Sequence, residues 1–245
     1  MIRFLYLAAM LLIWSGWSDA NAAQQPGEST PGQGSDTMAI SDDKHSTVAG
    51  GRPVVLLGAS YAEGLKLAQL AGRALVNKGV GGEESGGMLD RFQTDVVDVD
   101  PEMVILWGFI NDIFRSDRAK MADTITKVKN NYMAMVALAR ENGIVPVLVT
   151  EITMSRRPGV KERVMDWVAG VMGKTSYQDF INGHVMEVNR WMKEYAEQNG
   201  LKLLDFQALL AEGGVMRVMT NAQADGSHVS ERGYALIADY LSKQF

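Results

Sequence analysis

The sequence predicts an α/β domain in which helices cover both faces of a five-stranded parallel sheet. Three observations predict this fold. Five short, mostly apolar runs occur along the chain, and runs such as residues 53–57 are typical of strands buried on both faces. Segments with apolar residues at three- and four-residue steps alternate with several of these runs, as expected of helices. The chain has 245 residues, of which 47% are hydrophobic and 22% are charged, values that suit one soluble globular domain.

The predicted elements follow one another in a regular order. The strands are expected at residues 53–57, 74–77, 103–107, 145–149 and 201–204. The helices are expected at residues 61–71, 116–142 and 231–243. The long second helix has the most regular apolar spacing, with Met121, Ile125, Val128, Tyr132, Met135 and Ala139. Gly143 is placed to end this helix. Connections between the parallel strands are expected to be right-handed.

The N-terminal residues have the features of a signal peptide. Arg3 supplies a positive charge, residues 4–14 form an apolar run, and residues 20–22 (Ala-Asn-Ala) offer a cleavage site. The run is shorter than the roughly 20 residues that span a bilayer, although an uncleaved anchor is the alternative. No cysteine is present to carry a lipid. We therefore expect an exported protein, periplasmic or secreted, with no stable membrane span once residues 1–22 are removed.

A polar segment separates this leader from the folded domain. Residues 23–51 are rich in Gln, Gly, Ser, Thr, Pro and Asp, with few large apolar side chains. Such a segment buries too little surface to offset its ordering entropy, so we expect a flexible linker. His45 lies in this linker, and no part in the chemistry is expected of it. The folded domain is expected at residues 52–245.

The composition excludes several classes of function. With a net charge of −5, the chain does not favour nucleic acid as a partner, because phosphate binding requires clustered Lys and Arg. The absence of cysteine excludes disulfides, thiolate catalysis and cysteine-based zinc sites. Three histidines, His45, His184 and His228, are the candidates for any mechanism that depends on an imidazole.

Two short blocks follow the first two predicted strands, at the sheet edge where α/β folds bind ligands. Ser60 comes directly after the first strand and opens a helix, whose N-terminus offers free N–H groups and a partial positive charge. This position suits a nucleophile, and a plain helix cap is the alternative. Gly79, Gly81 and Gly82 follow the second strand, and a backbone N–H there can donate to a developing oxyanion. The alternative is an ordinary turn; the block lacks the Gly-Lys-Ser/Thr ending of a phosphate loop.

Two further blocks carry side chains suited to oxyanion binding and proton transfer. Asn111 follows the third strand, and an Asn N–H in a preorganised oxyanion site contributes about 3 kcal/mol. A simple Asn-Asp turn is the alternative. Asp225 lies three residues before His228, so its carboxylate can accept the imidazole Nδ1–H and leave Nε2 to take a proton. The alternative is a surface turn that leads to a helix capped by Ser230.

Taken in this order, the four blocks resemble those of the SGNH, or GDSL-type, esterase and lipase family. The resemblance covers about residues 53–245 and lies in the ordered set rather than in one block. It implies a three-layer α/β/α sandwich of the flavodoxin-like kind. It also implies that Ser60 is the nucleophile, that His228 is the general base and acid, and that Asp225 orients His228.

The family resemblance also implies an oxyanion hole. The Ser60 N–H, the Gly82 N–H and the Asn111 side chain would form it. Gly82 is chosen over Gly81 because Asn77, Gly79 and Gly82 match the family pattern Asn-x-Gly-x-x-Gly.

Two positions depart from the family pattern. Ala59 stands where the family usually has Asp before the serine, but that Asp is not the acid of the triad. Phe109 stands where the family usually has Gly two residues before Asn111, and Gly108 lies one residue earlier. The bulky Phe109 is expected to narrow the pocket or to shift Asn111.

The activity implied by the resemblance is that of a serine hydrolase of carboxylic esters. The substrate would be an acyl ester of a small molecule, a lipid or a sugar, and no metal or organic cofactor is needed. A carbohydrate O-acetylesterase or O-acetyltransferase of envelope polysaccharide is one alternative, because the same triad serves water and sugar acceptors. The other alternative is a non-catalytic binding module on the same fold, which the presence of Phe109 suggests.

One segment exceeds a minimal domain of this kind. Residues 154–186 are expected to form a helical insertion. Its apolar residues at helical spacing are Val160, Val164, Trp167, Val168, Val171 and Met172. Two interpretations stay open: a helix packed on the edge of the domain, or a mobile flap over the active site that contacts an acyl chain.

Overall fold

The structure, a computed structural model, describes residues 51–155 and 176–245. The predicted signal peptide and nearly all of the predicted linker lie outside these residues. The apolar stripe of the predicted insertion, at residues 160–172, lies outside them as well.

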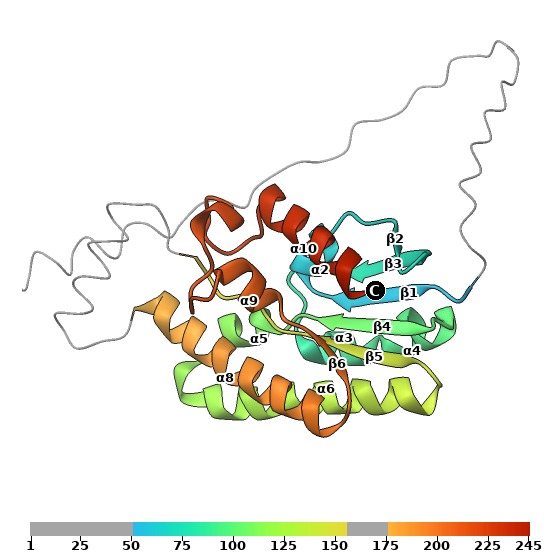
Figure 1. Ribbon diagram of the computed structural model, residues 1–245. Coiled ribbons are helices and arrows are strands. Elements are labelled where there is room, and N and C mark those ends of the chain that lie inside the picture. The colour runs from blue at the N-terminus through green and yellow to red at the C-terminus, as the bar shows by residue number, and fades with distance from the viewer. Residues whose placement is uncertain (1–50, 156–175) are drawn as a thin grey trace, which may run out of the picture. The chain divides into compact units, whose positions relative to one another are not determined.

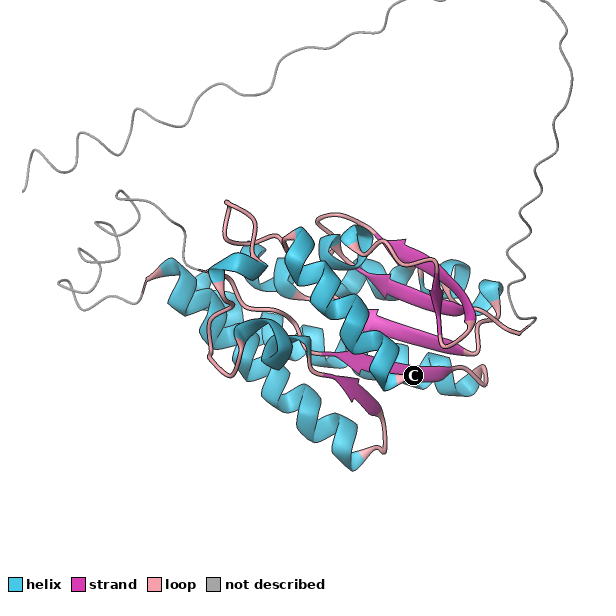
Figure 2. Ribbon diagram, turned by 45° about the horizontal axis from the view of Figure 1, so that its top comes forward, coloured by secondary structure: helices cyan, strands magenta, loops and turns pink. Residues whose placement is uncertain are grey.

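A six-stranded sheet of order β2-β3-β1-β4-β5-β6 forms the centre of the domain. The strands are β1 (Val54–Gly58), β2 (Gln69–Leu70), β3 (Arg73–Gly79), β4 (Met103–Trp107), β5 (Val145–Val149) and β6 (Lys202–Leu204). All except β2 run parallel, so their carboxyl ends lie along the same edge of the sheet (Figure 2). The five predicted parallel strands are therefore confirmed, and their order is that of flavodoxin-like folds. After β3 is added on one side of β1, the next strand, β4, is added on the other side. The strand order therefore reverses between β1 and β4, and such folds bind ligands at this point.

Helices cover both faces of this sheet. They are α2 (Ser60–Gly64), α3 (Ser85–Asp90), α4 (Phe92–Asp95), α5 (Ile110–Arg115), α6 (Met121–Glu141), α8 (Tyr177–Gln198), α9 (Phe206–Ala211) and α10 (Glu231–Gln244). Short 3₁₀ turns occupy Val97–Val99, Arg118–Lys120 and Met219–Asn221. The helices α9 and α10 lie on one side of the sheet, and α6 and α8 lie on the other (Figure 1). The predicted layered α/β architecture is thus confirmed. Within the described ranges, no helix is both long and apolar enough to cross a bilayer.

The core forms as the apolar spacing predicts. Every residue of β1 is buried, in keeping with a central strand covered on both faces. All six apolar positions predicted to line the long helix are buried in α6. This helix begins at Met121, after a 3₁₀ turn, rather than at residue 116. Gly143 follows its C-terminus with a φ of +66°, the left-handed conformation that ends many helices.

The helix predicted at residues 61–71 is shorter than expected. It ends at Gly64, and Leu65 after it has extended backbone. The chain then enters a hairpin in which Ala71 (φ 54°) and Gly72 (φ 72°) join β2 to β3. Positive φ at both central residues is the geometry of a tight two-residue hairpin turn. The pairing of β2 with β3 therefore overrides the local helical spacing.

Residues 177–186 of the predicted insertion form the first part of α8. Ser176 caps this helix by accepting a hydrogen bond from the Asp179 N–H at 3.1 Å. The helix packs against α5 and α6 and leads the chain to β6. Asn189 of α8 holds Glu151 through two backbone hydrogen bonds, each 2.8 Å long. Because Glu151 lies just beyond the end of β5, α8 fixes the edge of the sheet where the candidate site lies.

Candidate active site

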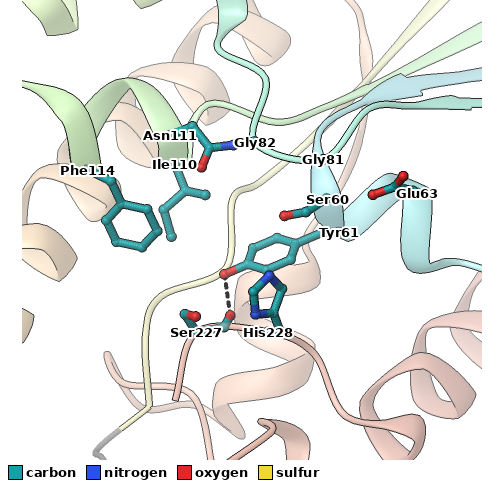
Figure 3. A pocket seen from close by; sticks show the side chains of 10 residues that line it. All are labelled: Ser60, Tyr61, Glu63, Gly81, Gly82, Ile110, Asn111, Phe114, Ser227 and His228. Carbon is teal, nitrogen blue, oxygen red and sulfur yellow. Dashed lines mark hydrogen bonds between the residues drawn. The ribbon is translucent and has the colours of Figure 1, made fainter. Parts of the chain in front are cut away.

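Four of the predicted site residues lie around one pocket. Ser60, Gly82, Asn111 and His228 all line a hollow of about 520 Å³ at the carboxyl ends of β1 and β4 (Figure 3). They come from four separate stretches of the chain. The sheet topology therefore brings together the blocks that the sequence places far apart. We call this hollow the oxyanion pocket, after the role that the sequence predicts for Gly82 and Asn111.

Ser60 is the first residue of α2 and follows β1 after a single residue. The backbone passes close to β4 at this turn. A Cβ on Gly58 would lie 2.1 Å from the Trp107 carbonyl oxygen, so only glycine fits there. As the first helical residue, Ser60 has an N–H that helix geometry leaves free. Ala59, at the position of the family's Asp, is buried and donates its N–H to Trp107 at 3.3 Å. Its side chain does not line the pocket.

Asp225 and His228 form a direct side-chain pair. One carboxylate oxygen of Asp225, Oδ2, contacts Nδ1 of His228. The other oxygen, Oδ1, accepts the backbone N–H groups of Ser227 at 2.9 Å and His228 at 3.0 Å. Burial alone would raise the pKa of Asp225, but the hydrogen bonds from His228 and Ser227 outweigh it and hold that pKa well below its ordinary value. An ionised Asp225 fixes the proton of His228 on Nδ1 and leaves Nε2 as the acceptor.

The hydroxyl of Ser60 and the imidazole of His228 border the same pocket. Among the described residues, no hydrogen bond joins the two side chains. Hydrogen bonds between catalytic groups are often long without substrate and tighten only in the complex. The placement of the two groups is therefore compatible with proton transfer between them.

Asn111 and Gly82 present N–H groups to the oxyanion pocket. The Asn111 amide donates one N–H to the Glu83 carbonyl at 2.8 Å, which fixes its orientation. An amide nitrogen carries two N–H groups, so a second one is available for a ligand. Gly82 has a φ of +76°, which favours glycine, and in the described part of the chain its N–H has no hydrogen-bond partner. These donors can stabilise a negative oxygen next to Ser60.

Phe109 does not occupy this pocket. Its side chain is buried in the core and packs edge-on against Tyr132, with ring centres 6.1 Å apart. The expectation that Phe109 narrows the pocket is therefore wrong. The physical reason is that Phe109 precedes α5 and directs its ring toward α6, whereas Ile110 and Asn111 face the pocket.

The loop that carries Gly82 is held from two sides. Asp112, which follows Asn111, accepts the Ser85 N–H at 2.8 Å and the Ser85 hydroxyl at 2.7 Å. Arg91 binds the Glu83 carboxylate at 2.5 Å and the carbonyl of Lys78 at 2.8 Å. The carboxylate of Asp112 is buried, and this burial raises its pKa despite the bonds from Ser85. These contacts fix the positions of Gly82 and Asn111, as a preorganised oxyanion site would require.

Sequence reasoning missed three buried residues beneath the site: Tyr61, Glu151 and Arg217. Glu151 accepts the N–H of Phe109 at 2.8 Å and that of Ile110 at 3.2 Å, and so fixes the start of α5. Burial raises the pKa of Glu151, while its backbone hydrogen bonds and the positive Arg217 oppose that rise. Glu151 follows the fourth predicted strand, so the carboxyl-end rule could have identified it.

Tyr61 and Arg217 hold the loop that carries His228. The Tyr61 hydroxyl donates to the Ser227 carbonyl at 2.5 Å (Figure 3). Arg217, only 1% exposed, donates to the same carbonyl and to that of Gly226. Its guanidinium lies 5.6 Å from the centre of the Tyr61 ring. The three buried residues thus contact the chain neighbours of Ser60, Asn111 and His228, and they fix the relative positions of these blocks.

Replacing Arg217 with methionine is expected to lower the free energy of unfolding by about 1–3 kcal/mol, because it removes the hydrogen bonds from a buried cation to the carbonyls of Gly226 and Ser227. Urea denaturation measures the effect. Arg52→Met is the matched control, since Arg52 pairs with Asp100 at the surface and its loss should cost less than about 1 kcal/mol. Equal losses in the two variants would contradict a structural role for Arg217.

Comparisons with known proteins agree with the fold described above. The chain matches the family described as GDSL-like lipase/acylhydrolase over residues 34–236. A solved structure assigned to the G-D-S-L lipolytic family, from Desulfitobacterium hafniense DCB-2, aligns with a TM-score of 0.60 and 21% identity over 80% of this chain and 100% of that one. An acetylxylan esterase from Geobacillus stearothermophilus aligns with a TM-score of 0.58 and 16% identity over 80% and 95%.

A lipase/acylhydrolase from Enterococcus faecalis aligns with a TM-score of 0.58 and 19% identity, over 79% of this chain and 95% of that one. At these identities the solved structures establish the fold alone. Among curated proteins, an uncharacterized lipoprotein of Bacillus subtilis is 29% identical over 86 residues. That match spans 35% of each protein, about a third of the relative's length.

Proposed function

This chain belongs to the GDSL-like lipase/acylhydrolase family, and from that premise we propose that it hydrolyses carboxylic esters with Ser60 as nucleophile, His228 as base and Asp225 as the partner of His228. One observation carries the proposal. The Asp225–His228 pair and Ser60 meet at a pocket that also contains two oxyanion donors, Gly82 and Asn111. A nucleophile, an oriented base and an oxyanion site together are the requirements of acyl transfer.

The proposed reaction begins with attack of the Ser60 hydroxyl on the ester carbonyl carbon. His228 Nε2 takes the hydroxyl proton, while ionised Asp225 stabilises the resulting imidazolium. The carbonyl oxygen becomes an oxyanion and accepts hydrogen bonds from the Gly82 N–H, the Asn111 amide and the Ser60 N–H. The carbon–oxygen bond to the alcohol then breaks, and His228 returns its proton to the leaving oxygen.

The second half of the reaction releases the acid. Water attacks the acyl–Ser60 ester and gives a proton to His228, and the same donors stabilise the second oxyanion. His228 then protonates the Ser60 oxygen as the bond between it and the acyl carbon breaks. Ser60 and His228 return to their initial states, so the cycle is closed with one water consumed.

A fluorophosphonate probe tests this proposal against a non-catalytic binding module. The probe reacts with activated serine hydroxyls, so we expect labelling of the wild type and none of Ser60→Ala. Ser242→Ala is the control, because Ser242 lies on α10 outside the pocket and should keep full labelling. A wild-type protein that stays unlabelled would favour the binding module.

A further inference from the structure

A second pocket adjoins the oxyanion pocket on the other side of Ser60. It has a volume of about 510 Å³ and shares Ser60, Glu63 and His228 with its neighbour. Its other lining residues are Gly64, Lys66, Gln223, Val229, Glu231 and Tyr234. We call it the polar pocket. The two hollows meet at the nucleophile and the base.

The walls of the two pockets differ in chemistry. Beyond the oxyanion donors and the three shared residues, the oxyanion pocket is bordered by the apolar side chains of Ile110 and Phe114 and by Tyr61, Gly81 and Ser227. Figure 3 shows Asn111 and Phe114 on the side of Ser60 opposite to Glu63. The polar pocket has Glu63, Lys66 and Glu231 in its wall, together with an amide and a phenol ring. An ester that spans both would therefore place an apolar half and a polar half in different surroundings.

The charge of the two walls, together with the direction of the attacked carbonyl, indicates which half of the ester lies in which pocket. The carbonyl oxygen must face Gly82 and Asn111, so the acyl and alcohol groups extend in other directions from the Ser60 oxygen. His228 must reach the alcohol oxygen to protonate it; His228 borders both pockets, so it can serve an alcohol held in the polar pocket. An apolar acyl group placed beside three charged side chains would desolvate them without compensation. The acyl group therefore fits beside Ile110 and Phe114, and the alcohol fits the polar pocket.

Several groups in the polar pocket have hydrogen-bonding capacity to spare. Within the described residues, neither the Glu63 nor the Glu231 carboxylate forms a hydrogen bond or ion pair. Gln223 uses its amide N–H on the Val229 carbonyl at 3.0 Å and keeps its oxygen as an acceptor. Tyr234 donates its hydroxyl to the Tyr61 carbonyl at 3.1 Å, which fixes its ring in the wall. The pocket thus offers a surplus of acceptors beside an aromatic ring.

We propose that the polar pocket binds the alcohol half of the substrate and that this alcohol is a neutral polyol such as a sugar, held by hydroxyl hydrogen bonds to Glu63 and Glu231. Hydroxyl groups are donors, and carboxylates accept their hydrogen bonds strongly. Two carboxylates and one ammonium group give the pocket a net negative charge, which disfavours a phosphate-bearing alcohol. This inference rests on the proposed ester hydrolysis.

The test compares two acetyl esters that differ only in the alcohol: a methyl glycoside with one O-acetyl group, and 4-nitrophenyl acetate. Glu63 is exposed, so Glu63→Ala and Glu63→Gln should fold like the wild type. We expect Glu63→Ala to lower the ratio of kcat/KM for the sugar ester to that for the aryl ester by roughly tenfold, the effect of one hydrogen bond to a charged group. Glu63→Gln keeps an acceptor and should lower the ratio less.

Phe114→Ala is the matched control in the oxyanion pocket. It should change the preference between aryl butyrate and aryl acetate while the sugar-to-aryl ratio stays closer to that of the wild type. A ratio in Glu63→Ala within twofold of the wild-type ratio would overturn the inference and leave ester hydrolysis standing. So would a larger change of that ratio in Phe114→Ala than in Glu63→Ala. A wild type that hydrolyses neither ester would overturn the proposed function itself.

Discussion

Replacing Ser60 with alanine is expected to lower kcat/KM for 4-nitrophenyl acetate by roughly 10⁴- to 10⁶-fold, because the covalent route then disappears. The backbone should change little, since Ser60 is the first residue of α2 and its side chain makes no hydrogen bond to any described residue. Substrate binding uses the walls of the pocket rather than the hydroxyl. The loss should therefore fall on kcat, with KM close to its wild-type value.

Steady-state kinetics and far-UV circular dichroism on the same preparations measure this effect. The residual rate should not respond to an added fluorophosphonate, because the oxyanion donors alone supply it. If Ser60→Ala kept a kcat within tenfold of the wild type, another nucleophile would be responsible. Ser227 would then be the first to test, because it also borders the oxyanion pocket.

The parts of the fold that sequence predicted well are those set by local spacing. Burial on both faces gives a strand such as β1 an unbroken apolar run, and amphipathic packing gives α6 its three- and four-residue steps. The helix expected at residues 61–71 failed for a non-local reason. Gln69 and Leu70 near its end pair as β2 with β3, and that pairing depends on a turn at Ala71 and Gly72.

The contacts of the candidate site also fall into two groups: those that local spacing predicts and those that only the folded chain shows. Asp225 and His228 are three residues apart, so one turn of chain suffices to bring their side chains together, and spacing alone predicts the pair. Tyr61 and Ser227 are 166 residues apart, and Glu151 and Phe109 are 42 apart. No local pattern reports such contacts. Arg217 lies in a loop with exposed apolar neighbours, and only the folded chain shows that its side chain is buried.

The Phe109 departure shows how a family pattern can mislead about one side chain. Compared with the family's glycine, Phe109 adds a large ring close to Asn111 in the sequence, and the sequence alone predicts a narrowed pocket or a shifted Asn111. The backbone at Phe109 instead directs the ring into the core, and the Phe109 N–H donates a hydrogen bond to Glu151. Phe109 is the main argument for a non-catalytic binding module. Asn111 still lines the oxyanion pocket, so the structure does not support that argument.

Replacing Asp225 with asparagine is expected to lower kcat roughly 10³- to 10⁴-fold while the fold is kept. The amide oxygen of Asn can still accept the two backbone N–H groups that Oδ1 accepts from Ser227 and His228. The amide nitrogen replaces Oδ2 and donates a hydrogen bond instead of accepting one. His228 must then accept at Nδ1 and carry its proton on Nε2, where it cannot take the proton of Ser60.

Two further variants distinguish the effect of Asp225 on the tautomer of His228 from its effect on the stability of the turn. Asp225→Ala removes both the partner of Nδ1 and the acceptor of the two backbone N–H groups, so it should lose about 1–2 kcal/mol of stability that Asp225→Asn retains. Asp239→Asn, at a surface pair with Lys243 on α10, should keep both stability and turnover. The measurements are kcat, KM and urea denaturation for all three variants. A kcat for Asp225→Asn within tenfold of the wild type would show that Asp225 holds only the turn, because a neutral partner would then orient His228 equally well.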